Sequence, residues 1–507
     1  MAEAAIESSQ ASRTFCPRRR RRFVLIAAIL ASSMGFIDGS VISIATPAIR
    51  STLPATLAEA LWINNAYMLF LSSLILIGGA AGDRYGLRRV FMIGIGVFVS
   101  ASLICTIAPN AEVLIGARAI QGIGAALMVP GSLAIIAKAY PAAERGKAIG
   151  TWAAASALTT AAGPVLGGLV LSGLGDSAWR LLFAINLPLG ALALAMLWFL
   201  VPPDSAEGRR RLDIVGGALI TLALLILAWG LTGSGGEGST PEMSLLLPAL
   251  ALSLGLLAVF IWWERRFDHP MVPLGLFADR AFSGANLLTF GLYFGLSSML
   301  FYLPMTVIGG WGVPEAYASL MFVPLTVMIG LLSSRTGDWA DRHGPAMPVA
   351  IGSLVVALAY GLLAATVHLQ SFWFGVLPLM TLAAFGMALL VSPLSTAVMN
   401  AVDDEETGTA SGINNAMSRM AGLVAVAAMG LLAATLYPAI IDVATAGGLS
   451  FGESLDDVDP AVQQAHSAAT TTTFAVMAGV TAALSVLSAI IGWTTLPRTG
   501  TASEGKG

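Results

Sequence analysis

The sequence predicts an all-α polytopic membrane protein of fourteen transmembrane helices, built as two pseudo-symmetric six-helix halves with two inserted helices. Composition is the first reason, because only 11% of the 507 residues are charged and 56% are hydrophobic. Soluble domains are about 25% charged, and a soluble chain of this length could not cover so much apolar surface. The other two reasons are a series of membrane-length apolar stretches and an internal duplication.

The apolar stretches follow one another from the N-terminal arginines to the C-terminus. Those of the first half lie near residues 24–48, 60–80, 90–109, 112–137, 148–172 and 180–201. The two inserted helices are predicted near 213–232 and 245–263, and those of the second half near 284–308, 317–335, 347–367, 372–398, 410–436 and 471–496. A secretory signal is the alternative for the first stretch, but this stretch is longer than a signal core and contains Asp38, so a membrane helix is favoured.

The placement of basic residues predicts the orientation. With fourteen helices both termini share one side, and every Lys and Arg except Arg50, Arg118, Arg180 and Arg419 falls on that side. Cytoplasmic loops carry the excess of Lys and Arg in membrane proteins, so both termini are expected in the cytosol. The long outer loop at 437–470 contains acids but no Lys or Arg.

Two repeated patterns indicate the duplication. G-x-x-x-D-R-x-G occurs at 79–86 and again at 337–344, each time between two apolar stretches. E-x-G-x-A-x-G opens one helix at 144–150 and another at 406–412. Internal repeats of this kind are common in secondary transporters. The predicted parts are a basic cytosolic tail at 1–22, an N-terminal half at 23–201, a linker with the inserted helices at 202–266, a C-terminal half at 267–497 and a cytosolic tail at 498–507.

Several function classes are excluded by what the sequence lacks. It contains no phosphate-binding loop G-x-x-x-x-G-K-[ST], no nucleophile constellation and no paired catalytic carboxylates. Cys16 and Cys105 form no disulfide framework, and the four histidines have no metal-ligand spacing. We therefore expect no enzyme, no metal, no cofactor and no ATP-driven transport. No nucleic-acid partner is expected, and the net charge of −3 itself says little about partners because the charges are segregated by position.

Asp38 and Arg118 are charges at membrane depth, where ionisable groups are costly and point to function. Asp38 follows Phe23 by fifteen residues, roughly 22 Å along a helix, and both charges are expected in the outer half of the bilayer. A carboxyl whose proton affinity responds to a nearby arginine suits a proton-coupled carrier. The alternative is a static ion pair that fixes helix packing.

The helix of Arg118 continues with Gln121 and Gly122. Gln121 lies three residues on and therefore shares a face with Arg118. Gly122 and Ala126 form a small-residue surface for close helix contact. By themselves these glycine positions would indicate ordinary packing.

Two further motifs contain glycine. Gly163, Pro164, Gly167 and Gly168 lie in one predicted helix, where the proline removes a backbone hydrogen bond and the glycines permit close approach. In the first copy of the repeated loop pattern, an inner gate is expected from Gly79, Asp83, Arg84, Gly86, Arg88 and Arg89, and in the second copy from Asp341 and Arg342. The alternative is that these charges only fix the orientation of the helices in the membrane. This alternative would explain the arginines but not the repeated spacing of the acid and the glycines.

Polar residues within other predicted helices are candidates for a substrate cavity. They are Asn64, Asn65, Tyr67, Asn286, Tyr293, Asn414, Asn415 and Arg419. Arg419 is the second base at membrane depth. The methionines and phenylalanines nearby are expected mainly to pack or to face lipid.

These motifs resemble the major facilitator superfamily, and most of all its fourteen-helix drug–proton antiporter branch, over residues 24–496. Asp83, Gly86 and the arginines match the inner-loop motif, although Leu87 stands where a base is common. Arg118, Gln121 and Gly122 match the fourth-helix motif, and Gly163 to Gly168 match the antiporter motif. The first-helix signature matches at Asp38 and Pro47, and the helix-6 entry at Trp179, Arg180, Phe183, Asn186, Pro188 and Gly190.

The resemblance implies a proton-driven exporter of amphipathic drugs or toxic metabolites in the cytoplasmic membrane, working by alternating access. Asp38 and Arg118 would be the proton-linked pair, and a small molecule and the lipid bilayer the partners, with envelope partners unknown. The absence of acids at depth in the C-terminal half disfavours multivalent cations as substrates. A dedicated metabolite carrier is the alternative, and a non-transporting sensor a remote one.

Overall fold

The computed structural model describes residues 15–204, 212–233, 243–403, 406–441, 448–455 and 458–499. Within these ranges all regular secondary structure is helical, and fourteen helical segments are long and apolar enough to cross a membrane. The predicted fold class and helix count are therefore confirmed. Arg209 to Arg211, Asp442, Asp456 and Asp457 lie outside the described residues.

The N-terminal half contains six membrane segments. They are α2 (Arg18–Thr52), α3 (Leu57–Tyr85), α4 (Leu87–Thr106), α5 (Ala111–Ala139), α6 (Ala142–Leu174), and the pair α7 (Trp179–Ala184) and α8 (Asn186–Phe199), which follow the short turn η1 (Asp176–Ala178). The insert consists of α9 (Ile214–Thr232) and α10 (Met243–Glu264).

The C-terminal half also contains six. After the turn η2 (Leu274–Ala278), the first segment is α11 (Arg280–Met305) with η3 (Thr306–Gly310), and the second is α12 (Glu315–Ala318), η4 (Ser319–Phe322) and α13 (Val323–His343). The third is α14 (Ala346–Thr366) with η5 (Val367–Leu369), and the fourth is η6 (Phe372–Val376) with α15 (Leu377–Asn400). The last two are α16 (Thr407–Ile440) and α18 (Pro460–Thr495).

The last helix begins well before the predicted residue 471. The Asp459 side chain accepts a hydrogen bond from the Ala461 backbone N–H at 2.8 Å, and Pro460 occupies the first helical position. Both are strong helix-start signals. Because α16 also runs on to Ile440, the outer connection predicted at 437–470 is shorter than expected.

The basic run at the N-terminus is helical, whereas the sequence predicted that it belongs to a tail that ends before the first helix. Arg18 to Arg22 form the first turns of α2. The Arg21 side chain donates a hydrogen bond to Glu144, in the first turn of α6, at 3.1 Å. A carboxylate near the N-terminus of a helix is stabilised by the helix dipole. Glu144 has this position in α6, and through Arg21 it also fixes the start of α2.

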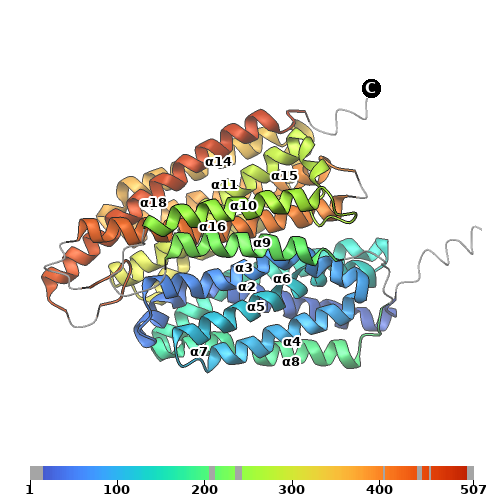
Figure 1. Cartoon of the computed structure of the whole chain (residues 1–507), viewed down its shortest axis with the longest axis horizontal. Helices are drawn as coiled ribbons and strands as arrows, with labels where there is room; N and C mark the ends of the chain where they lie inside the picture. The colour runs from blue at the N-terminus through green and yellow to red at the C-terminus, as the bar shows by residue number, and fades with distance from the viewer. Residues whose placement is uncertain are drawn as a thin grey trace, which may run out of the picture.

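The two halves repeat the same packing, as an internal duplication requires. In the N-terminal half α5 packs on α3 and α4, and α2 packs on α6 and α8. In the C-terminal half α15 packs on α13 and α14, and α11 packs on α16 and α18. Figure 1 shows the halves as two stacked layers, with the first turn of α2 and the last of α18 at one end. We call this the terminal end and the opposite one the far end.

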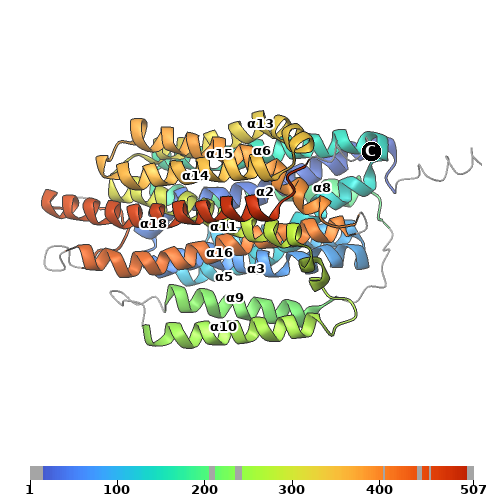
Figure 2. The same ribbon diagram turned by 90° about the horizontal axis from the view of Figure 1, so that it is seen from above.

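The contacts between the halves follow the same symmetry. α3 packs on α16, and its counterpart α13 packs on α6, while α2 meets α11 between them. The insert breaks the symmetry because α9 packs on α3 and α16, at one edge of the molecule (Figure 2). The opposite edge, along α6 and α13, has no equivalent cover in the described part of the chain.

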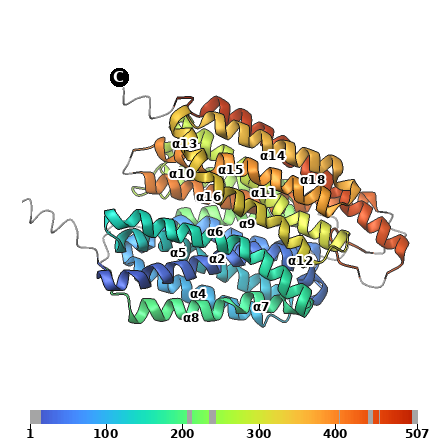
Figure 3. The same ribbon diagram turned by 180° about the vertical axis from the view of Figure 1, so that it is seen from behind.

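The halves are held together at the far end. Arg50, at the end of α2, is 6% exposed and donates to the Phe451 carbonyl at 2.9 Å. Its guanidinium also lies 3.6 Å from the Glu453 carboxylate. On the other edge the Ser172 hydroxyl donates to Glu315 at 3.0 Å. In Figure 3, α13 and α14 lean away from the N-terminal half toward the terminal end.

The inserted helix α9 offers a matched test of its packing. Leu224 is 3% exposed in an apolar cluster with Leu69 of α3 and Leu423 of α16, whereas Leu222 is 46% exposed. Leu224→Ala should cost about 2–4 kcal/mol of stability through the cavity it leaves. Leu222→Ala should cost much less. Thermal unfolding of the purified protein in detergent measures both, and equal losses would contradict this packing.

Candidate functional site

Asp38 of α2 and Arg118 of α5 meet in the interior of the N-terminal half. Both are completely enclosed, with 1% and 0% of their surfaces exposed. One terminal nitrogen of Arg118, Nη1, donates to Asp38 Oδ2 and forms an ion pair with it. Removing charges from water is expensive, so each group depends on the other for its neutralisation.

Gln121 completes the cluster from the next turn of α5. Its carbonyl oxygen accepts from Arg118 Nη1 at 2.8 Å, and its Nε2 donates to Asp38 Oδ1 at 2.9 Å. Both oxygens of the carboxylate therefore accept a hydrogen bond, one from a cation and one from an amide. Such a carboxylate is held in a single orientation.

Two residues on other helices extend the network. Gln121 Nε2 also donates to the Ser102 hydroxyl of α4 at 2.9 Å, and Asn186 of α8 donates to the same hydroxyl at 3.2 Å. The residues linked in this way lie on α2, α4, α5 and α8. The sequence did not identify Ser102, because a lone serine in an apolar helix carries no distinctive spacing. Asn186 was noted only through the family motif.

α3 forms the remaining wall around Arg118. The Ile63 carbonyl accepts from Arg118 Nε at 3.0 Å, and the guanidinium carbon lies 4.2 Å from the centre of the Tyr67 ring. This is a close cation–π geometry. Tyr67, which the sequence assigned to a substrate cavity, is 2% exposed and packs on the ion pair. Arg118 Nη2 is buried and has no hydrogen-bond partner in the described residues.

The glycines of α6 lie against two different elements. Side chains built at Gly163 and Gly167 would come 2.5 Å from Ser40 Oγ and Val41 Cγ2, so both glycines pack on α2 beside Asp38. One built at Gly168 would come 2.5 Å from the Glu315 carbonyl of the other half. Pro164 lies between these contacts within the helix. One helix therefore touches both the segment that contains Asp38 and the C-terminal half.

The first copy of the repeated loop pattern joins α3 to α4 at the terminal end. Gly86 has φ of +95°, which favours glycine. A carboxylate from the linker, Asp204, accepts from the backbone N–H groups of Leu87 and Arg88 at 2.9 and 3.0 Å, and so caps α4. The sequence did not identify Asp204, because the linker has no periodic pattern.

The arginines of this copy have different surroundings. Arg88 donates to the carbonyls of Leu197 and Trp198 at the end of α8, at 2.8 and 3.1 Å. Arg84 lies over the Tyr85 ring. Asp83 and Arg89 are exposed. Gly79 lies near Pro130 of α5, at a distance that leaves room for a side chain.

The second copy repeats the turn but has other neighbours. Gly344 has φ of +81°, matching Gly86. It packs against the backbone of Pro497 and Arg498, which follow α18. Asp341 and Arg342 are exposed in the last turn of α13. The two copies are thus alike in backbone and different in what they contact.

The remaining candidates lie on α3, α11 and α16. Asn64 and Asn65 are buried and hydrogen-bonded to each other at 3.4 Å. Asn414 of α16 donates to Asn286 and Thr289 of α11 at 3.3 and 2.8 Å. Tyr293 and Arg419 are half-buried. Asn415 of α16 is exposed. Gly122 of α5 packs closely on the Tyr67 backbone of α3.

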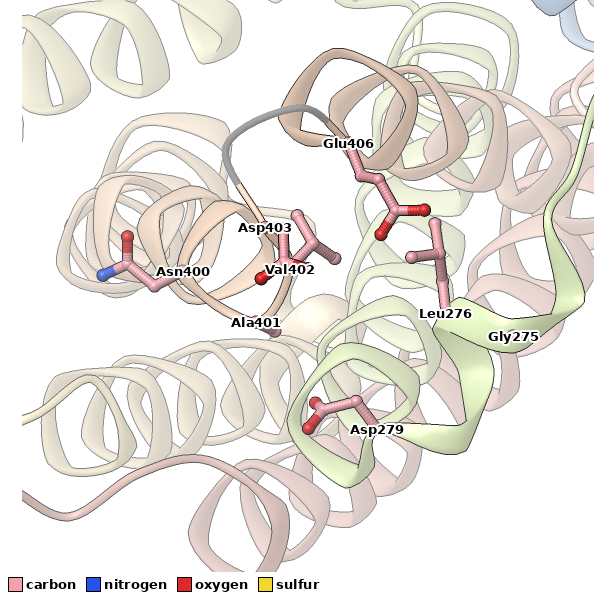
Figure 4. A pocket seen from close by; sticks show the side chains of 8 residues that line it. All are labelled: Gly275, Leu276, Asp279, Asn400, Ala401, Val402, Asp403 and Glu406. Carbon is pink, nitrogen blue, oxygen red and sulfur yellow. The ribbon is translucent and has the colours of Figure 1, made fainter.

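A hollow at the terminal end lies apart from all these residues. It has a volume of about 290 Å³ and is lined by Gly275, Leu276, Asp279, Asn400, Ala401, Val402, Asp403 and Glu406 (Figure 4). Asp279 caps α11 by accepting from the Phe282 N–H at 2.8 Å. Asp279 is therefore explained by local helix structure, and none of the predicted site residues line the hollow.

Comparison with known proteins gives a consistent result. The family model described as "Major Facilitator Superfamily" matches residues 25–426 and again 285–507. The chain is 32% identical to the multidrug resistance protein Stp of Mycobacterium tuberculosis (strain CDC 1551 / Oshkosh), over 83% of this chain and 78% of that protein. It is also 32% identical to a probable actinorhodin transporter of Streptomyces coelicolor, over 82% and 73% of the two chains.

Solved structures of the same fold are more distant in sequence. A bacterial homologue of the human lysosomal transporter Spinster, inward-facing and unoccupied, matches with a TM-score of 0.67 at 17% identity, over 95% of this chain and 99% of that one. The inward-open xylose transporter XylE from E. coli matches with a TM-score of 0.61 at 16% identity, over 94% and 97%.

The ion pair leads to a prediction about stability. Arg118→Met leaves the Asp38 carboxylate buried without a partner cation and should destabilise the protein by about 3–5 kcal/mol. Adding Asp38→Asn to that variant removes the uncompensated charge and should restore a large part of the loss. Thermal unfolding in detergent compares the single and double variants. A double variant no more stable than Arg118→Met would contradict this account.

Gly168 leads to a prediction about conformation. Gly168→Val puts a side chain into the Glu315 backbone and should separate the halves at the far end. Gly173→Val is the control, because a side chain there meets nothing within 4 Å. Spin labels on α6 and α12 should report a longer mean distance only for Gly168→Val. An unchanged distance would show that this contact is not needed to close the far end.

Proposed function

The chain belongs to the major facilitator superfamily, and on this premise we propose that it is a proton-coupled antiporter that exports amphipathic small molecules by alternating access. It is a multi-pass protein of the cell membrane, with fourteen apolar helices. Members of the family are transporters rather than enzymes, and the relatives named for multidrug resistance and for an antibiotic support a role in export.

The observation that carries the proposal is the enclosed cluster of Asp38, Arg118 and Gln121. A carboxylate that accepts from both a guanidinium and an amide can take up a proton only if those donors rearrange. Protonation therefore removes the counterion of a buried arginine, and the surrounding helices must respond. A proton on Asp38 is in this way linked to the arrangement of α2, α4, α5 and α8.

α6 is the element that would transmit this change to the other half. It packs on α2 through Gly163 and Gly167, next to Asp38, and on the C-terminal half through Gly168. Pro164 removes the backbone hydrogen bond to the Thr160 carbonyl, in the turn that leads into these contacts, and permits bending there. For antiport, uptake of an external proton while the far end is open would shift α2 and favour closure of the far-end contact. Release of that proton to the cytosol would then restore the ion pair that the structure shows with the far end closed.

The direction of transport follows from the arrangement of charges. We take the terminal end as cytosolic, because it carries most of the basic residues. The far end, closed by Arg50 and Ser172, is then external, and a compound would enter from the cytosol. The proton gradient supplies the energy, the bilayer and the transported compound are the partners, and no bound cofactor is needed.

Asp38→Asn tests the proton-linked role. The variant should lose energised efflux because its side chain can no longer gain and lose a proton, while it still exchanges compound down a concentration gradient. Expression in a pump-deficient bacterium, with a panel of dyes and antibiotics and with a protonophore, measures efflux. Glu112→Gln, an exposed carboxyl on α5, is the control.

The amount of each variant in the membrane must be measured alongside efflux. Full energised efflux by Asp38→Asn would overturn the proton-linked role. Loss of the folded protein in proportion to the loss of efflux would instead indicate a static ion pair that only supports packing.

A further inference from the structure

Arg419 is a charge at membrane depth that the proton-linked cluster does not use. It lies twelve residues into α16, about 18 Å along the helix. It is the only charged residue of α16, and α14, α15 and α18 contain none. Within the described residues Arg419 forms no hydrogen bond and no ion pair. A guanidinium in this position is costly unless something compensates its charge.

The contacts of α16 show where Arg419 faces. Asn414 bonds to α11 of the same half, while Gly412 lies against Leu76 of α3 in the other half. With 3.6 residues per turn, the helix face between these two contacts carries Ser411, Asn415, Ser418 and Arg419. This polar face therefore looks between α3 and α11, where the two halves meet.

The other polar residues of this face are satisfied along their own helix. The Asn415 amide donates to the Ser411 carbonyl at 3.1 Å, and the Ser418 hydroxyl donates to the Asn415 carbonyl at 2.8 Å. Arg419 differs because its donors have no such partner. It is half-buried, so part of its surface remains accessible, and it lies on the polar face of α16.

Tyr293 is a half-buried tyrosine on α11, the helix that Asn414 contacts, and lies two turns beyond Asn286. Its phenol hydroxyl can donate a hydrogen bond, and its ring provides apolar area. Arg419 and Tyr293 thus offer a fixed positive charge, a hydroxyl donor and an aromatic face from neighbouring helices.

The buried acid of the N-terminal half is already engaged. Asp38 bonds to Arg118 and Gln121. No acid of the described residues pairs with Arg419, so its charge is available to an anion from outside the protein. A planar guanidinium binds carboxylates and similar oxyanions through two parallel hydrogen bonds.

We propose that Arg419 binds the anionic group of the transported compound, with Tyr293 on the neighbouring helix α11, so that the substrates are amphipathic organic anions. This inference rests on the proposed transport function and adds the substrate class. A cationic compound would meet an unpaired positive charge on entering and would be disfavoured. An inside-negative membrane potential would assist the export of such anions.

Binding of two dyes with the same ring system tests the proposal. The full chain is placed in nanodiscs of zwitterionic lipid, so that the dye is the only organic anion present. Fluorescence anisotropy then compares fluorescein, which is anionic, with rhodamine 123, which is cationic. The wild type should bind fluorescein more tightly.

Substitutions at Arg419 give the decisive comparison. Arg419→Gln should weaken fluorescein binding at least about tenfold, because a charge-assisted contact is lost. Arg419→Lys should fall in between, and Arg419→Glu should reverse the preference between the dyes. Arg335→Gln, an exposed arginine on α13, is the control and should change neither affinity.

The proposal would be overturned if the wild type bound fluorescein no more tightly than rhodamine 123. It would also be overturned if Arg419→Gln left fluorescein binding unchanged. The assay contains no proton gradient, so it is independent of coupling. Arg419-dependent binding together with normal energised efflux by Asp38→Asn would overturn the proton-linked role and leave the anion site standing.

Discussion

The enclosed ion pair of Asp38 and Arg118 is the constraint on which the N-terminal half depends. Neither charge is tolerable there alone, so the helices around the pair supply further hydrogen bonds, although Arg118 Nη2 has no partner within the described residues. Gln121, Ser102 and the Ile63 carbonyl do so from three different helices. The close approach of α3, α4 and α5 is thus required by electrostatics as well as by apolar packing. A change in the charge of Asp38 must therefore alter how these helices are held.

The C-terminal half repeats the packing of the first without repeating its chemistry. α11 stands where α2 stands, yet it has no acid at depth, and α15 has no counterpart of Arg118. The charge at membrane depth in the C-terminal half is Arg419, which lies on α16, the counterpart of α6. Duplication thus supplied one scaffold twice, while the buried charges of the halves differ in number and position. This division suits a protein in which one half binds the proton and both halves form the space for the transported compound.

The sequence predicted the helix count, the duplication and the two charges at depth, because each leaves a regular or costly signature in the chain. It did not predict Ser102 or Asp204, since their importance comes from partners on distant helices. Tyr67 illustrates the same limit: its polarity suggested a cavity, and the structure packs its ring on Arg118. The early start of α18 was missed because Pro460 lies in a polar stretch, where hydropathy gives no signal and only the capping by Asp459 does.

The position of α6 links the two halves of the molecule by direct contact. Its glycines bring it against Ser40 and Val41 of α2 and against the Glu315 backbone of α12, so no side chain of α6 lies between these surfaces. Close-packed backbones transmit displacement because they cannot be compressed. Its counterpart α16 also meets α3, where Gly430 packs on the Leu61 side chain. The halves are therefore joined along both edges, and a rotation of one half against the other would have to break such contacts to open the far end.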